Sequence, residues 1–482
     1  MELKQSDKDY FIKAIMNNDI SAVKRLIKQD PSLVNDCESP SLFSRATGGP
    51  HSKLQHLLEQ GGGSLDTARS DKMRSVIRSA ISPLRLAAQH GFTAIVKELL
   101  QKGADVNKQD TDSFTALHAA SQDGYRETLK ELLTNGADTE VKDVIGRTAL
   151  RLAVKDGHSA TVELLLSWGA RADTLSLDGY NTLVVAAQEG HELVVRQLVQ
   201  HGMDVNETIE NGLNPLLVAV ERGNIAMVKE LLLHDARVDL RDSATGLTPL
   251  QVSAQRGYLD ILNLLLANGS IVKEQHPVKG GTALHEAAQT GETRIANELL
   301  QRGANVDMVD NMSMTPLLIA STQGYSEFCS LLLAHGSDPE IKYPVTGGTA
   351  LTAAAIGGHH STALAIISAG ADINLEERNS PLSMACQEGH LSTVLSLLQC
   401  QEVKAQSSAM NNAAKANKAA IVDILIDHGY DPEMVRLFFT STFPSQLVFS
   451  GCWHTWKKAP YDCCGARIRR DNQGAPVQQS TS

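Results

Sequence analysis

Aromatic residues are scarce in this chain: they make up 4% of its 482 residues, while hydrophobic residues as a whole make up 42%. A core must therefore be built mainly from Leu, Ile, Val and Ala. Basic residues are also outnumbered, with 44 Lys and Arg against 55 Asp and Glu and a formal net charge of -11. This balance argues against a general binder of nucleic acid or of anionic membranes, which would need a basic face.

Cysteine is infrequent as well. The seven cysteines are odd in number and scattered, which does not fit a disulfide scaffold. The first residues, "MELKQSDKDYFIKAIMNNDI", lack a basic tip followed by an apolar run, so no secretory signal is predicted. Together these features predict a reducing compartment, the cytoplasm, with the nucleus as an additional location.

Long hydrophobic runs are missing too. The most apolar stretch, residues 350–371, is interrupted by glycines and by His359 and His360. We therefore expect no membrane span there.

What the chain does have is a repeated unit. The leucine of "TALH" and of its copies recurs at steps of 33, 33, 33, 33, 34, 34, 33 and 34 residues, and a fixed period in this range indicates a stacked array. These leucines are Leu84, Leu117, Leu150, Leu183, Leu216, Leu250, Leu284, Leu317 and Leu351.

Three features recur in register with the leucines. A threonine that can cap a first helix precedes most copies, a glycine that can end a second helix follows them, and pairs of small residues such as Ala119-Ala120 permit close helix contact. The threonines are Thr115, Thr148, Thr248, Thr282, Thr315 and Thr349. In these features the unit resembles the ankyrin repeat.

The resemblance implies an all-α ankyrin-repeat solenoid, curved, of about thirteen helix-turn-helix units joined by β-hairpin-like loops. Each unit has an apolar stripe, for example Leu117, Leu129, Leu132 and Leu133, that only a neighbouring unit can bury. We expect degenerate repeats at 8–63 and 376–432 on either side of nine regular repeats at 82–375. The remaining segments are an insertion at 64–81 and a non-repeat tail at 433–482.

Few residues indicate chemistry. By the resemblance, His118 and His285 belong to a hydrogen-bond network that joins units, and no nucleophile can be paired with a base. The tail contains Cys452, His454, Cys463 and Cys464, but adjacent cysteines fit zinc poorly, so neither a metal nor a cofactor is predicted. A basic group in the tail is either an import or docking signal or a solvated charged tail: Lys457, Lys458, Arg467, Arg469 and Arg470.

Without a catalytic site, we expect binding on the repeat surface. In ankyrin proteins the hairpin tips and the exposed ends of the first helices line a concave face that binds partner proteins. By register, the tips are Phe114, Val144, Ile145, Arg147, Tyr180, Leu213, Leu247, Met312 and Met314. The helix ends are Gln122, Asp123, Lys155, Asp156, Gln188, Glu189, Glu221, Arg222, Gln255, Arg256 and Gln289. Exposed apolar tips would mark an interaction surface; the alternative is that they only pack against the next hairpin.

Asn107 and Asn206 follow Asp-Val in "GADVN" and "GMDVN", with Leu99 and Leu198 eight positions upstream. This resembles the site at which an iron- and oxoglutarate-dependent hydroxylase modifies ankyrin hairpins. The alternative is that asparagine is simply a good turn residue.

The predicted function is a non-catalytic protein-interaction scaffold or adaptor. A narrower alternative is a substrate-recognition subunit of a cullin-type ubiquitin ligase, which would bind elongins and a cullin. That family carries a suppressor-of-cytokine-signalling box, and no such box is recognisable in this chain.

Overall fold

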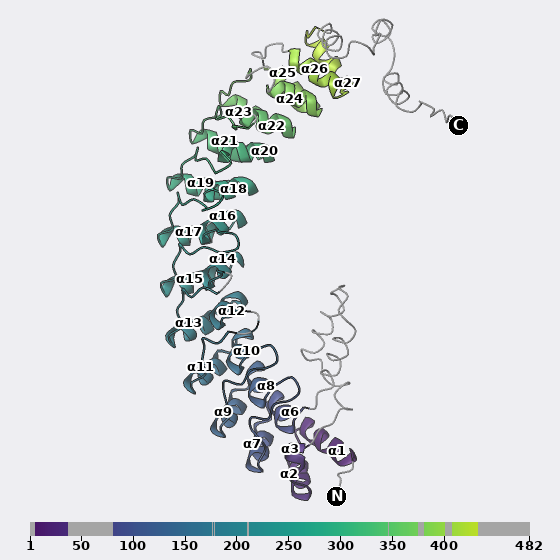
Figure 1. The fold of residues 1–482 in the computed structure, drawn as a ribbon, viewed down its shortest axis with the longest axis vertical. Coiled ribbons are helices and arrows are strands. Elements are labelled where there is room, and N and C mark those ends of the chain that lie inside the picture. Colours follow the sequence, from purple (N-terminus) through teal and green to yellow (C-terminus); the bar gives the residue numbers. More distant parts are fainter. Residues whose placement is uncertain are drawn as a thin grey trace, which may run out of the picture. The chain divides into compact units, whose positions relative to one another are not determined.

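The protein is described by a computed structural model, which defines residues 5–36, 81–175, 177, 179–209, 212–345, 347–374, 380–400 and 407–431. The described residues form 25 helices and no strand, which confirms the predicted all-α architecture. All of these helices except the short α3 form consecutive pairs joined by a turn (Figure 1).

The chain divides into two compact units, Met1–Pro316 and Leu317–Ser482. The helices of the first unit are α1 (Gln5–Met16), α2 (Ile20–Gln29), α3 (Leu33–Asp36), α6 (Pro83–Gln89), α7 (Thr93–Gln101), α8 (Ala116–Gln122), α9 (Arg126–Thr134), α10 (Ala149–Lys155), α11 (Ser159–Ser167), α12 (Thr182–Glu189), α13 (Glu192–Gln200), α14 (Pro215–Glu221), α15 (Ile225–Leu233), α16 (Pro249–Arg256), α17 (Leu259–Ala267), α18 (Ala283–Thr290) and α19 (Thr293–Gln301).

Helix α20 (Pro316–Gln323) crosses the boundary between the two units. The remaining helices belong to the second unit: α21 (Ser326–Ala334), α22 (Ala350–Gly357), α23 (His360–Ser368), α24 (Pro381–Glu388), α25 (Leu391–Leu398), α26 (Ser407–Lys415) and α27 (Ala419–Asp427).

Each unit is built of two helix layers. In the first unit the first helices of successive pairs pack on one another from α6 to α18, and the second helices do the same from α7 to α19. In the second unit α22, α24 and α26 form one layer, and α21, α23, α25 and α27 form the other. Helices of seven to nine residues are too short to be stable alone in water, so these contacts between neighbours hold them folded.

The predicted apolar stripe is buried. Leu117, Leu129, Leu132 and Leu133 are each at most 3% exposed. Burying one such side chain contributes about 1.5–3 kcal/mol relative to leaving it exposed. The core is accordingly a continuous aliphatic layer between the two sets of helices.

The predicted caps account for where most first helices begin. The Thr115 hydroxyl accepts from the His118 N–H at 3.3 Å, and asparagine takes the same role at Asn181 and Asn214. Thr349 differs, because its hydroxyl makes no hydrogen bond within the described residues and nothing in the structure explains the loss.

The second helices end at residues with positive φ, such as Gly136 at 84°. Asp235 occupies the same place in its unit with a φ of 60°, a conformation that costs a side chain more than it costs glycine. Elsewhere, none of the described helices combines the length and the apolar character needed to cross a membrane.

Candidate functional site

The histidine of "TALH" is structural. His118 is 1% exposed, its Nδ1 lies 2.8 Å from the Thr115 hydroxyl, and its Nε2 lies 3.1 Å from the Arg147 carbonyl of the next unit. His285 repeats the arrangement with Thr282 and the Met314 carbonyl. Burial lowers the pKa of both histidines, which favours the neutral ring. The predicted network between units is present.

Register within the hairpin decides which tip residues reach solvent. The residue directly before each cap turns inward, and this contradicts the expectation that Phe114 and Leu247 are exposed: they are 7% and 5% exposed. The Phe114 ring lies beneath the Arg85 guanidinium, 4.5 Å from its carbon to the ring centroid, and contacts the His118 ring. Both residues are therefore packing residues of the array, and we no longer assign them to a binding face.

The other residues at this register are half-buried. Tyr180 and Leu213 pack against a buried cluster of Val184, Ile209 and Val218, so the alternative of packing holds for them as well. These apolar contacts occur where Val184 and Leu217 replace the polar residue that corresponds to His118.

Arg147 and Met314, at the same register, also serve the hairpins. The Arg147 guanidinium forms an ion pair with Asp143 at 2.7 Å, and its N–H donates to the same carboxylate at 2.8 Å. The Met314 N–H donates to Asp310 at 2.8 Å, and its carbonyl lies 3.3 Å from His285 Nε2. Both residues are half-buried and fix the hairpin shape.

Three and four positions before the cap, side chains point to solvent. Val144 is 55% exposed, Ile145 is 47% exposed and Met312 is 66% exposed, as expected for a binding tip. Leu177, 79% exposed, lies at the same register and was not among the predicted residues, nor was the nearby Leu175. The signal that could have found them is an apolar residue in the hairpin turn of "DTLSLDGY", where polar residues are usual.

Backbone hydrogen bonds align successive tips. The Val144 N–H donates to the Asp112 carbonyl at 3.1 Å, and the Leu177 N–H donates to the Ile145 carbonyl at 3.2 Å. Val144, Ile145 and Leu177 thus form one apolar strip across adjacent hairpins, which we call the tip strip.

The first-helix ends are exposed or half-exposed, as expected. Exposed members are Asp123, Lys155, Asp156, Glu189, Glu221, Arg222, Arg256 and Gln289, and half-exposed members are Gln122, Gln188 and Gln255. Partial burial, and then the negative charge of Asp156, raises the pKa of Asp123. Carboxylates of successive helix ends therefore interact across the layer. Gln255 differs, because its amide donates to the buried Glu286 at 3.1 Å.

The two candidate hydroxylation residues lie at the hairpin bases and join neighbouring units. The Asn107 amide donates to the Gly136 carbonyl at 3.2 Å, and its oxygen accepts from the Asp138 N–H at 2.8 Å. Asn206 makes the same pair with the Asp235 carbonyl at 3.2 Å and the Arg237 N–H at 2.7 Å. We call each such pair of bonds a rung. Both amides already have a role in folding.

The tail cysteines and histidine considered as metal ligands, and the basic group beside them, lie outside the described residues. Across the ranges that are described, no three His, Cys, Asp or Glu side chains gather as a metal site would require.

Comparisons with known proteins agree with this architecture. A family model described as "Ankyrin repeats (3 copies)" matches residues 11–110, 51–143, 84–176, 117–209, 150–242, 183–276, 257–343, 284–377 and 350–436. Among solved structures, the chain is similar to the ankyrin repeat domain of Bcl-3, described as a unique member of the IkappaB protein family. The identity is 26% and the TM-score 0.42, over 46% of this chain and 98% of that one.

Proposed function

Because this chain belongs to the ankyrin-repeat family, we propose that it is a non-catalytic scaffold that binds a partner protein on its hairpin tips and first-helix ends. Members of this family bind proteins, and the coarse function follows from membership. The specific surface is our proposal.

The observation that carries the proposal is the tip strip. Monomeric proteins seldom leave contiguous apolar side chains in water unless they serve an interaction. Here Val144, Ile145 and Leu177 are each roughly half exposed or more, and backbone bonds between the hairpins hold them in line. A partner that covers them pays little ordering entropy, because the strip is already fixed.

The charges beside the strip favour one kind of partner segment. Asp123, Asp156 and Glu189 are exposed near the C-terminal ends of α8, α10 and α12, where the helix dipole is itself negative. The neighbouring Lys155 offsets only part of this charge. A segment with apolar side chains for the strip and basic side chains for the helix ends would complement both features.

The test is affinity capture with mass spectrometry on the full-length chain. Ile145→Ser combined with Leu177→Ser is expected to remove specific partners and to leave thermal unfolding unchanged, because both side chains are exposed. Tyr180→Ala combined with Leu213→Ala is the matched control, and it is expected to lower stability through lost packing. An unchanged set of captured proteins with the serine variant would refute the proposed surface.

The ligase-adaptor alternative would require elongins and a cullin among the captured proteins. Hydroxylation of Asn107 and Asn206 also stays a proposal, tested by a mass increase of one oxygen atom on the corresponding peptides from cells. Because both amides form rungs, we expect any modification to require local opening of the hairpin base.

A further inference from the structure

One rung of the hairpin ladder is not formed. Asp239 lies one repeat after Asn206, at the register where it would face Gly269 and Ile271. Its carboxylate instead accepts two bonds from Arg237, at 3.1 Å from Nε and 2.9 Å from a terminal nitrogen. The reason is chemical: an ionised carboxylate has no N–H to donate to the Gly269 carbonyl, so it cannot reproduce the asparagine rung.

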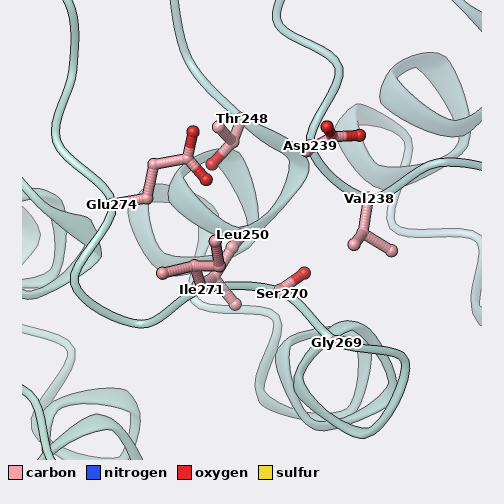
Figure 2. Close-up of a pocket in the computed structure, with 8 residues that line it drawn as sticks. All are labelled: Val238, Asp239, Thr248, Leu250, Gly269, Ser270, Ile271 and Glu274. Carbon is pink, nitrogen blue, oxygen red and sulfur yellow. The ribbon is translucent and has the colours of Figure 1, made fainter.

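A hollow of about 200 Å³ lies at this place, lined by Val238, Asp239, Thr248, Leu250, Gly269, Ser270, Ile271 and Glu274 (Figure 2). Figure 2 shows Asp239 at one end of the hollow and Gly269 at the other, with Ser270 beside Gly269. The unformed rung therefore leaves usable space between two hairpins.

Three polar groups at the hollow have no hydrogen-bond partner among the residues that the structure describes. They are the Gly269 carbonyl, the Ile271 N–H and the Ser270 hydroxyl. The hydroxyl is specific to this unit, since Ala137 and Ala236 occupy the corresponding place in two others. A donor, an acceptor and a hydroxyl thus converge on one small space.

We infer that this hollow binds the primary carboxamide of an asparagine or glutamine side chain carried by a partner polypeptide. The partner's amide nitrogen donates to the Gly269 carbonyl and its oxygen accepts from the Ile271 N–H, as the Asn206 amide does with Asp235 and Arg237 one repeat earlier. Leu250 and Val238 contribute apolar surface for the methylene groups.

Other side chains fit less well. A carboxylate would be repelled by Asp239 and Glu274, which both line the hollow. A lysine or arginine cannot accept from the Ile271 N–H, and the two carboxylates are already paired with Arg237 and Arg241. The site lies at the hairpin bases and is separate from the tip strip, so its test needs no identified partner.

The test is an NMR titration of the full-length chain labelled with ¹⁵N-isoleucine, in which the Ile271 amide signal is followed. The probes are N-acetyl-glutamine methylamide and, as a control of nearly the same shape, N-acetyl-glutamate methylamide. We expect a saturable shift with the glutamine probe at about millimolar concentration, since so small a ligand has a small binding free energy. The glutamate probe is expected to give a markedly smaller shift.

Two variants at one position make the result decisive. Asp239→Asn supplies the chain's own carboxamide and is expected to abolish the response, whereas Asp239→Ala keeps the hollow open and is expected to retain it. An equal response to both probes, no response to either, or a response that survives in Asp239→Asn would overturn the inference.

Discussion

The unformed rung can be completed by a single substitution, Asp239→Asn. The new amide would occupy the register of Asn107 and Asn206 and face the Gly269 carbonyl and the Ile271 N–H. The structure therefore predicts that a conservative, nearly isosteric change on an exposed hairpin stabilises the protein locally.

The magnitude follows from the existing rungs. Each consists of one bond of 3.2 Å from the amide nitrogen and one of 2.7–2.8 Å to the amide oxygen. A hydrogen bond of this kind contributes about 0.5–1.5 kcal/mol net, and these hairpin bases are partly solvated, which favours the lower end of the range. The lost ion pair with Arg237 is exposed and contributes little because solvent screens it. We expect a net gain of about 1 kcal/mol.

The assay is amide hydrogen exchange, because unfolding of a long repeat array need not be two-state. A gain of about 1 kcal/mol slows exchange of the Ile271 N–H by about fivefold. Asn107→Ala is the reverse control, and it is expected to speed exchange of the Asp138 N–H by a similar factor. Exchange at Ile271 that is unchanged or faster in Asp239→Asn would refute the reasoning, provided that Asn107→Ala shows its effect.

Three further predictions concern other parts of the chain. Because burial lowers the folded-state pKa of His118 and His285 below 6.5, the unfolded state takes up protons first, so stability is full above about pH 6.5 and falls as the pH drops below it. Replacing both histidines with glutamine, which bridges units at Gln251, should flatten urea stability measured between pH 7.5 and 5; an equally steep loss would contradict this. Burial raises the pKa of the Cys329 thiol to about 11 and of the Cys386 thiol to about 12, so both should resist maleimide in the native protein, whereas rapid labelling would show them accessible. Tyr180→Ala with Leu213→Ala should lower the unfolding temperature, and no change would mean that their packing contributes nothing.

The helix pairs could be predicted from sequence because one short-range signal repeats many times. Leucines at steps of 33 or 34 residues, with caps before them and glycines after them, specify which face of each helix is buried. Leu117, Leu129 and Leu132 are buried for that reason. The boundaries of the degenerate repeats and of the tail stay predictions.

The binding surface was less accessible to sequence reasoning, because exposure in a hairpin depends on position within a five- or six-residue turn. Phe114 and Ile145 are both apolar and lie only two positions apart in register, yet the first packs under Arg85 and the second faces solvent. Composition cannot distinguish them; the backbone conformation of the hairpin does.

The hollow was also beyond sequence reasoning. Asp239 and Asn206 are similar turn residues by propensity, and only their hydrogen-bond partners show that one closes a rung while the other pairs with Arg237. A missing contact is visible only beside formed copies of the same contact.

The tip strip is tested most directly by site-specific photo-crosslinking in cells. A photoreactive amino acid placed at Leu177, which is 79% exposed on a hairpin tip, is compared with one at Leu233, which is 77% exposed at the end of the second helix α15. The account predicts crosslinks to a discrete partner from position 177 and none from position 233. Equal crosslinking from both positions, or crosslinks from position 233 alone, would contradict it.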